Sequence, residues 1–382
     1  MIYLDNAATS FPKPQCVVDA VSNFLTHIGA TPGRSAHSLS IQSGRLLYET
    51  RLALANFIKQ EDERRIIFTS NATSAINAVL YGLLKPNDKV ITTALEHNSV
   101  IRPLHTLSQR RNIRIHIIES SPFCEIDLDS LEQELKDARV LVCTYANNVT
   151  GAVLPIKTLR ELTHQYGVLM VLDASQAIGS LEVLAAQADI ICASCHKGLY
   201  APSSLGFISL NPAFDEEMLD HFMQGGSGSR SENIEHPIEL PDKYECGTPN
   251  MCAIAGLYAG IEWLNQQGLE KIHTSQMALW NQLYQGIFSL ENIKIYDVCA
   301  SHLATLAFNI EGFSPSEVGL RLDQEFGILT RVGLHCSPLT HKSIGSFALG
   351  GSVRISIGAF NTAEEIDKAI EAIAHIAHCL RR

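Results

Sequence analysis

The 382-residue sequence lacks several features that would assign it to a large class of proteins. No apolar run approaches the roughly 20 residues that a membrane-spanning helix needs, so we expect no membrane span. No block of Lys or Arg occurs and the formal net charge is -11, which argues against a nucleic-acid surface. The first residues, Met1–Asp5, have neither the basic nor the apolar region of a signal peptide. These absences leave a cytoplasmic enzyme with small-molecule substrates as the expected class.

The sequence also lacks a regular cysteine spacing, although it contains ten cysteines. In a chain of this length we interpret them as reduced thiols rather than a disulfide framework. One stretch, Cys192-Ala193-Ser194-Cys195-His196, matches the pattern of covalent haem attachment, and its first part matches a redox or zinc pair. Haem of that type belongs to exported proteins, and a zinc site needs a second ligand pair that is missing here. We therefore expect packed thiols at a strand end and no metal site.

Short β-rich runs alternate with helix-like segments from about residue 64 to residue 210. Several runs are apolar on both faces, which is typical of strands covered by helices on either side. The sequence therefore predicts an α/β domain with a mostly parallel, seven-stranded sheet and a site at the carboxyl ends of its strands. The predicted strands are 65–69, 89–93, 113–118, 140–145, 168–172, 190–193 and 206–210, and the main predicted helices are 72–84, 96–110, 127–137 and 156–166.

The second half of the chain has a different pattern. A Gly-rich start, Gly225–Arg230, opens an irregular segment over 224–250, and a loop of this length in a compact protein tends to be functional. A helical pattern over 251–290 leads into a smaller α+β domain, which ends in a helix with a capping box at Thr362. The expected strands of that domain lie near 302–310 and 352–359. The predicted parts are an N-terminal segment joining the small domain (1–20), a large domain (21–260) and the small domain (261–382).

Polar residues at two neighbouring strand ends point to a cofactor. Lys197 closely follows the apolar run 188–192, and Asp173 ends the run 168–172. A pyridoxal phosphate (PLP) enzyme needs a lysine that bonds covalently to the cofactor's aldehyde. It also needs a carboxylate that keeps the pyridine nitrogen protonated, so that the ring accepts electrons. A lone lysine at a strand end is usually a solvated surface residue, but the pairing with Asp173 favours PLP.

Other polar residues follow the predicted strands, and each has an ordinary alternative. The stretch Asn71–Ser74 opens a helix, so it is either a phosphate cradle or a common helix cap. Ser194 and His196 flank Lys197 and are placed for the same phosphate. His97 is either a ring-stacking proton shuttle or a solvent-facing loop histidine. The remaining candidates are Asn148 and Gln176, whose side-chain amides could meet the cofactor's phenolic oxygen. The ordinary alternative is a plain turn residue for Asn148 and a simple polar residue for Gln176.

Two residues of the second half carry the substrate chemistry. Gly333 and Pro338 bracket Cys336, which predicts a bent, exposed loop rather than a buried structural cysteine. Nearby Arg331 and His335 are expected to supply positive charge that favours the thiolate. Arg354 interrupts an apolar strand, where it either holds a substrate carboxylate with two hydrogen bonds or is an edge-strand charge that discourages aggregation.

Taken in order, these residues resemble the class V aminotransferase-like enzymes of PLP fold type I, and specifically the group II cysteine desulfurase and selenocysteine lyase family. The resemblance runs nearly end to end. It includes Tyr3-Leu4-Asp5-Asn6-Ala7-Ala8, Ala36-His37-Ser38-Leu39-Ser40, Glu96-His97, Asp173-Ala174-Ser175-Gln176-Ala177, Ser194-Cys195-His196-Lys197, Gly247-Thr248-Pro249-Asn250, Arg331-Val332-Gly333-Leu334-His335-Cys336, and Arg354 through Asn361-Thr362. The chain departs from the common pattern at Ala72, where Thr is usual, and at Cys195, where Gly is usual.

The resemblance implies a role for each cofactor-binding candidate. Lys197 bonds to PLP and then acts as the base at the substrate's α-carbon. Asp173 pairs with the pyridine nitrogen, Gln176 lies near the phenolic oxygen, and His97 stacks on the ring. The residues implied to bind the phosphate are Thr73, Ser194 and His196, with Thr248 contributed by the partner subunit of a homodimer.

The resemblance also implies the reaction. Asn148, Arg354 and His37 are expected to bind the substrate, and Cys336 is the nucleophile. The implied activity is removal of sulfur from L-cysteine, which yields L-alanine and a persulfide on Cys336 that passes to an acceptor protein or thiol. Three alternatives remain open: a selenocysteine lyase, another PLP-dependent β-lyase or aminotransferase, and a PLP-bound scaffold without catalysis.

Overall fold

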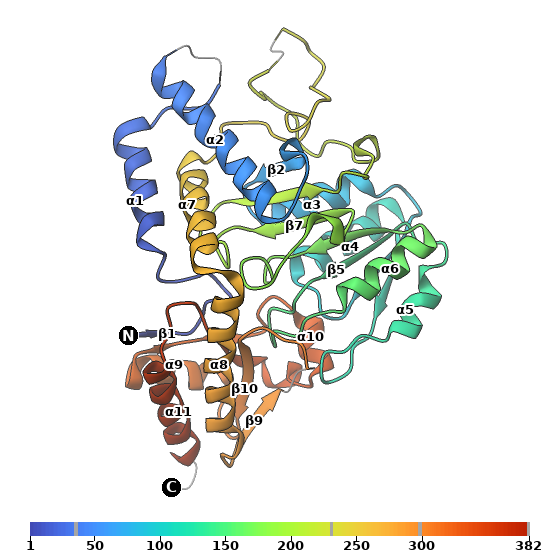
Figure 1. Ribbon diagram of the computed structural model, residues 1–382. Helices are drawn as coiled ribbons and strands as arrows, with labels where there is room; N and C mark the ends of the chain where they lie inside the picture. Colours follow the sequence, from blue (N-terminus) through green and yellow to red (C-terminus); the bar gives the residue numbers. More distant parts are fainter. Residues whose placement is uncertain (34–36, 230–231, 297–299, 380–382) are drawn as a thin grey trace.

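The computed structural model describes residues 1–33, 37–229, 232–296 and 300–379. Ala36 and Arg230, which belong to two of the stretches named above, lie outside the described residues. In the part that is described, no helix combines the length and the apolar character needed to cross a membrane. Figure 1 shows a large α/β part that contains the main sheet, and a smaller part below it that contains both chain ends.

The main sheet has seven strands in the order β2-β8-β7-β6-β5-β3-β4. β8 runs antiparallel to both of its neighbours, and the other neighbouring pairs are parallel. The prediction of a mostly parallel seven-stranded sheet is therefore confirmed. The strands are β2 (Ile66–Thr69), β3 (Lys89–Thr93), β4 (Arg114–Ile118), β5 (Val140–Thr144), β6 (Leu169–Asp173), β7 (Ile190–Ser194) and β8 (Gly206–Leu210).

Helices cover both faces of this sheet, as the apolar strands require. On β5, Val140 and Val142 pack on one face, while Leu141 and Cys143 pack on the other, because successive side chains of a strand alternate in direction. The first face is covered by α3 and α4, and the second by α5 and α6 with α2 and α7. These helices are α2 (Ser38–Phe57), α3 (Ala72–Leu83), α4 (Asn98–Arg111), α5 (Leu128–Leu135), α6 (Ile156–Tyr166) and α7 (Met251–Gln267).

The small part is built on an antiparallel sheet in the order β12-β13-β10-β9. The N-terminal strand β1 pairs in parallel with β11, and Ile2 and Leu4 belong to the hydrophobic core of this part. The domain boundaries themselves stay a prediction. The elements are β1 (Ile2–Tyr3), β9 (Ile293–Tyr296), β10 (Thr305–Ile310), β11 (Ile328–Leu329), β12 (Arg331–Gly333), β13 (Ser352–Ser356), α8 (Leu269–Phe288), α9 (Pro315–Phe326), α10 (Pro338–Ser343) and α11 (Ala363–His378).

Two details of the second half refine the prediction. The helical pattern over 251–290 forms two helices, α7 and α8, because Gly268 has a φ of 81°, a left-handed value that interrupts helical geometry. The capping box at Thr362 is confirmed, since its side chain accepts from the Glu365 amide and begins α11. The described residues of 224–250 form neither a helix nor a strand, as expected.

Candidate active site

Three parallel strands end side by side and bring the first candidates together. Asp173 is the last residue of β6, and it pairs with Thr144 at the end of β5 and with Cys192 on β7. Its side chain is buried, and one carboxylate oxygen accepts a 3.0 Å hydrogen bond from the Ser175 amide. Lys197 lies three residues beyond β7. The sheet topology therefore places the carboxylate and the lysine at the same edge, as predicted.

Lys197 is surrounded by charged groups from distant parts of the chain. Burial lowers the pKa of its amine, while Asp173 acts in the opposite direction by favouring the ammonium. Arg354 lowers the pKa of Lys197 further, and Cys336 raises it. Arg354 and Cys336 thus both lie within electrostatic reach of the lysine. A lysine whose pKa is lowered by burial is well suited to act as a nucleophile and a base.

His97 caps the N-terminus of α4 beside this pair. Its Nδ1 accepts a 3.0 Å hydrogen bond from the Ser99 amide, so the proton of the neutral ring belongs on Nε2. Burial lowers the pKa of His97; Asp173 raises it and Lys197 lowers it, which places the ring near both. A neutral, oriented imidazole at this position fits the stacking role expected of His97.

A polar cradle lies where β7 ends and β8 begins. The Ser194 hydroxyl is buried and has no hydrogen-bond partner in the described part of the chain. Ser194 pairs with Gly206, and a Cβ added at Gly206 would stand 2.5 Å from the Asn71 carbonyl carbon and 2.8 Å from the Ala72 nitrogen. The N-terminus of α3 therefore approaches the start of β8 closely. An orphaned hydroxyl beside a helix N-terminus provides donors of the kind that bind phosphate.

Other predicted cofactor ligands contact the N-terminal segment instead. The Gln176 side chain donates to the Ala7 carbonyl at 3.0 Å. The Nδ1 of His196 lies 2.9 Å from the Thr9 hydroxyl, and burial, with help from Lys197 and Lys13, lowers its pKa to about 4. Two further candidates are exposed to solvent in the single chain. They are Thr73, in the first turn of α3, and Thr248, which precedes α7. His37 is also exposed, and it caps α2 through a hydrogen bond from the Ser40 amide.

The Cys336 loop is bent and exposed, as predicted, with φ values of 48° at His335 and 58° at Cys336. Residues of the large part hold its backbone. The Asn98 amide donates to the Cys336 carbonyl at 2.7 Å, and the Asn148 side chain donates to the His335 carbonyl at 2.7 Å. The Ser337 hydroxyl donates back to the Asn148 side chain at 2.6 Å. The loop is thereby attached directly beside His97.

The expected positive charge on His335 is wrong. His335 is only 9% exposed, and burial, with Arg354 and His341, lowers its pKa to about 2, so the ring is neutral. Of the two cations expected beside Cys336, only Arg331 therefore carries a charge, and it is exposed. Sequence spacing alone does not reveal that the side chain beside an exposed cysteine turns inward.

Arg354 is buried in β13, which lies between β12 and β10, so the edge-strand alternative is excluded. Its Nη2 donates to Asp5 at 2.7 Å, and its Nη1 donates to the Asn148 carbonyl at 2.8 Å. Its buried Nε has no partner in the described part of the chain. The guanidinium is therefore fixed in place by two of its five N–H groups, which leaves donors for a further partner.

Sequence reasoning missed several residues of the site. Asp5 and Asn98 carry no recognisable signal of their own, because each acts on a residue hundreds of positions away. Glu96 was noted only as part of the Glu96-His97 stretch. It is completely buried, and burial raises its pKa to about 8, although Thr93 and Thr144 donate to its Oε1.

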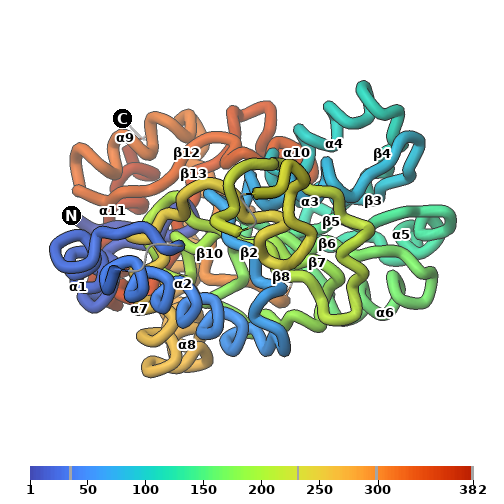
Figure 2. The backbone as a smooth tube through the Cα atoms, turned by 90° about the horizontal axis from the view of Figure 1, so that it is seen from above, coloured from blue at the N-terminus to red at the C-terminus, as the bar shows by residue number. Residues whose placement is uncertain are grey.

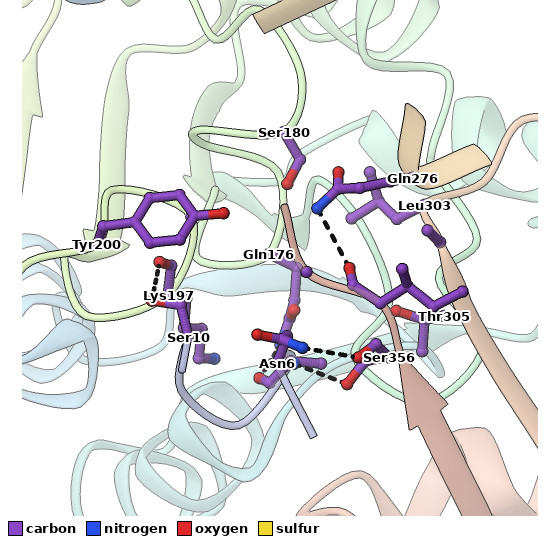
Figure 3. A pocket seen from close by; sticks show the side chains of 15 residues that line it. Asn6, Ser10, Gln176, Ser180, Lys197, Tyr200, Gln276, Leu303, Thr305 and Ser356 are labelled. Carbon is purple, nitrogen blue, oxygen red and sulfur yellow. Dashed lines mark hydrogen bonds between the residues drawn. The ribbon is translucent and has the colours of Figure 1, made fainter. Parts of the chain in front are cut away.

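A small pocket adjoins Lys197 where the N-terminal segment, the large part and the small part meet (Figure 3). Hydrogen bonds tie its walls together: the Ser10 hydroxyl donates to the Lys197 carbonyl at 2.9 Å, and Gln276 donates to the Ile357 carbonyl at 3.2 Å. The labelled side chains that line it are Asn6, Ser10, Gln176, Ser180, Lys197, Tyr200, Gln276, Leu303, Thr305 and Ser356.

Comparison with known proteins decides the family. Residues 2–369 match the family described as Aminotransferase class-V. The chain belongs to this family. A "Probable cysteine desulfurase" of Methanothermobacter thermautotrophicus is 31% identical over 381 residues, which are 98% of this chain and 94% of that protein. A "Probable cysteine desulfurase" of Synechocystis sp. is 32% identical over 385 residues, with 98% and 90% covered.

Solved structures agree with this class V assignment. The apo structure of a cysteine desulfurase from Thermococcus onnurineus NA1 has a TM-score of 0.93 at 28% identity, covering 99% of this chain and 94% of that one. A cysteine desulfurase from Escherichia coli has a TM-score of 0.87 at 23% identity, covering 99% and 94%, and supports the fold alone. The prediction of fold type I is thereby confirmed.

Proposed function

We propose that the chain is a PLP-dependent cysteine desulfurase, which converts L-cysteine to L-alanine and receives the sulfur on Cys336. The observation that carries the proposal is the attachment of the exposed Cys336 turn to Asn98 and Asn148, beside His97 and Lys197. An aminotransferase without sulfur chemistry has no use for a thiol held at this point. The named relatives support the same activity over nearly the whole chain.

The residues present fit PLP. The buried, unpartnered Ser194 hydroxyl and the N-terminus of α3 suit its phosphate, together with Thr73 and His196, and Lys197 would bond to the aldehyde. Asp173 is suited to the pyridine nitrogen. When bound, PLP supplies an electron-accepting ring that makes the substrate's α-proton acidic. The other proposed ligands are Gln176 at the phenolic oxygen, His97 on the ring face and the partner subunit's Thr248 at the phosphate.

The chain's own residues perform the remaining steps. Arg354 would bind the substrate carboxylate with N–H groups that Asp5 and the Asn148 carbonyl do not use, and the Asn148 side chain would assist from beside it. The Lys197 amine removes the α-proton and returns a proton. The Cys336 thiolate attacks the substrate sulfur, so an S–S bond forms while the bond from Cβ to sulfur breaks. Cysteine and the enzyme thiol thus become alanine and an enzyme persulfide, with all atoms accounted for.

We further infer a homodimer. Large apolar side chains are exposed on the helical turn Phe24–Ile28 that continues α1 (Gln15–Asn23), on α2 and in the loops that follow β8, including Leu25, Ile41, Phe222, Ile234 and Ile238. Both views place α1 and α2 at one end of the molecule with the described part of 224–250 beside α2 (Figures 1 and 2). A second copy covering this end would bury these side chains and bring a partner's Thr248 near a cofactor site.

The sulfur acceptor is proposed to be a protein or small thiol, since Cys336 is exposed. The buried thiols of Cys192, in β7, and Cys195, just beyond it, are free, which supports a reducing compartment such as the cytoplasm. Selenocysteine is the rival substrate. Because selenium is the better leaving group, its removal does not need the thiol.

The experiment compares the wild-type enzyme with Cys336→Ala, both loaded with PLP. The variant should keep the cofactor's visible absorbance, release no alanine from cysteine and form no persulfide. Alanine release from selenocysteine should persist in both proteins. Full turnover of cysteine by Cys336→Ala would contradict the role of the thiol, and turnover of selenocysteine alone by the wild type would assign the rival activity.

A further inference from the structure

A buried chain of hydrogen bonds lies directly behind the Cys336 turn. The Nδ1 of His335 is 3.1 Å from the Nε2 of His341, and the Nδ1 of His341 is 2.6 Å from the Ser346 hydroxyl. At the other end, the Nε2 of His335 is 3.5 Å from the Arg331 carbonyl. His341 and Ser346 are completely buried. None of these contacts belongs to the proposed reaction steps.

The groups at the two ends of this series of hydrogen bonds determine which atom donates in each bond. The Arg331 carbonyl only accepts, so the proton of His335 belongs on Nε2 and its Nδ1 accepts from His341. The proton of His341 is then on Nε2, and its Nδ1 accepts from the Ser346 hydroxyl. Both rings are neutral in this arrangement, as burial requires, since it lowers the pKa of His335 to about 2 and that of His341 to about 4. The Leu334 carbonyl is a further acceptor beside the His341 ring.

These hydrogen bonds hold the His335 side chain within the turn. His335 and Cys336 both have left-handed backbones, which are unfavourable for residues other than glycine. Asn148 and Asn98 hold the carbonyls of the turn, but these bonds do not orient the His335 ring. The buried ring is oriented by His341 on one side and by the Arg331 carbonyl on the other. The helix of His341, α10, is itself fixed, because Asn147 donates to the Thr340 hydroxyl at 2.9 Å.

We propose that His341 is a positioning residue for sulfur transfer, which holds Cys336 in its attacking position through the hydrogen bond to His335. Ser346 orients His341 by donating to its Nδ1. The inference rests on the proposed desulfurase function. It predicts that the loss of His341 impairs the thiol's attack while leaving PLP binding and chemistry that does not use the thiol intact.

The test measures the single-turnover release of alanine from cysteine and from selenocysteine by PLP-loaded enzyme. His341→Leu should slow the reaction with cysteine on the order of 10- to 100-fold, because small displacements of a reacting group cost this much. Its rate with selenocysteine and its visible absorbance should match the wild type. His341→Gln keeps a donor near the position of Nε2, so it should restore most of the rate with cysteine.

Serine variants provide a matched pair. Ser346→Ala should slow the reaction with cysteine, whereas Ser343→Ala should not, since among the described residues the Ser343 hydroxyl bonds only to the Leu339 carbonyl of its own helix, α10. Equal rates for His341→Leu and the wild type with cysteine would overturn the inference. Equal losses with both substrates, or a His341→Gln variant as slow as His341→Leu, would also overturn it. Failure of the wild type to act on cysteine would instead overturn the proposed function.

Discussion

Glu96 offers a prediction whose size follows from the structure. The carboxyl is completely buried, and its Oε1 accepts from the Thr93 hydroxyl at 2.7 Å and from the Thr144 amide at 3.0 Å. Its Oε2 is buried without a partner in the described part of the chain. Burial raises the pKa of Glu96 from 4.5 to about 8, and nearby Asp173 adds to the rise. The folded protein thus binds a proton at pH values where the unfolded chain has released it.

The sign of the pH dependence follows. A carboxyl with a raised pKa contributes stability that is fully present below pH 4.5 and is lost as the pH rises through about 8. Between about pH 5 and about pH 8.5 the loss amounts to about 4 kcal/mol, at 1.36 kcal/mol per pKa unit. Glu96→Gln cannot ionise, so its free energy of unfolding should rise relative to the wild type by that amount over this range. The unpaired amide adds a constant cost of about 1–3 kcal/mol that does not change with pH.

The assay is urea unfolding of both proteins at the two pH values, with the same PLP concentration throughout. Glu61→Gln is the control, because Glu61 is exposed and solvated whether or not the chain is folded. The difference between Glu61→Gln and the wild type should not change with pH. A difference between Glu96→Gln and the wild type that is equally independent of pH would refute the reasoning, since it would mean that Glu96 ionises in the folded protein as it does in water.

Three further outcomes are expected. Arg354→Met leaves the Asp5 carboxylate without its partner, so it should lower the free energy of unfolding by about 3–5 kcal/mol and raise the KM for cysteine; unchanged urea unfolding would contradict this. Gly206→Ala places a Cβ 2.8 Å from the Ala72 nitrogen, which should destabilise the fold by about 1–3 kcal/mol and weaken PLP binding in an absorbance titration; wild-type PLP affinity would count against the cradle. Burial lowers the pKa of His341 to about 4, so its contribution to stability is present above pH 6.5 and is lost as the pH falls toward 4. Between pH 6.5 and pH 4, the free energy of unfolding of His341→Gln in urea should therefore depend less steeply on pH than that of the wild type.

Much of the main sheet follows from local pattern. Runs such as Val140–Thr144 are apolar on both faces, and a strand of that kind is stable only between two helical layers. The helix over 156–166 occurs with the predicted bounds, and the capping box at Thr362 begins α11. The pattern over 251–290 is less informative. Its apolar periodicity continues through Gly268, whereas the helical geometry of the backbone is interrupted at that residue.

The proposed site likewise contains residues that the sequence predicted and residues that it missed. Asp173 and Lys197 were found because they lie at strand ends, and parallel strands of an α/β sheet end at one edge. Asp5 and Asn98 were missed because their partners, Arg354 and Cys336, come from the far end of the chain. The charge on His335 was predicted wrongly for a related reason, since its neighbours in sequence do not reveal its burial.

The amino-acid sequence by itself determined the α/β pattern, and it predicted Lys197 and Asp173 as the residues for PLP and Cys336 as the reactive thiol. Only the tertiary structure decided where that thiol lies, which groups are charged and which donors remain available. The physical reason is that motifs record short-range backbone preferences and residue chemistry. The ionisation of Glu96 and His335 depends instead on burial, which arises when segments hundreds of residues apart pack together.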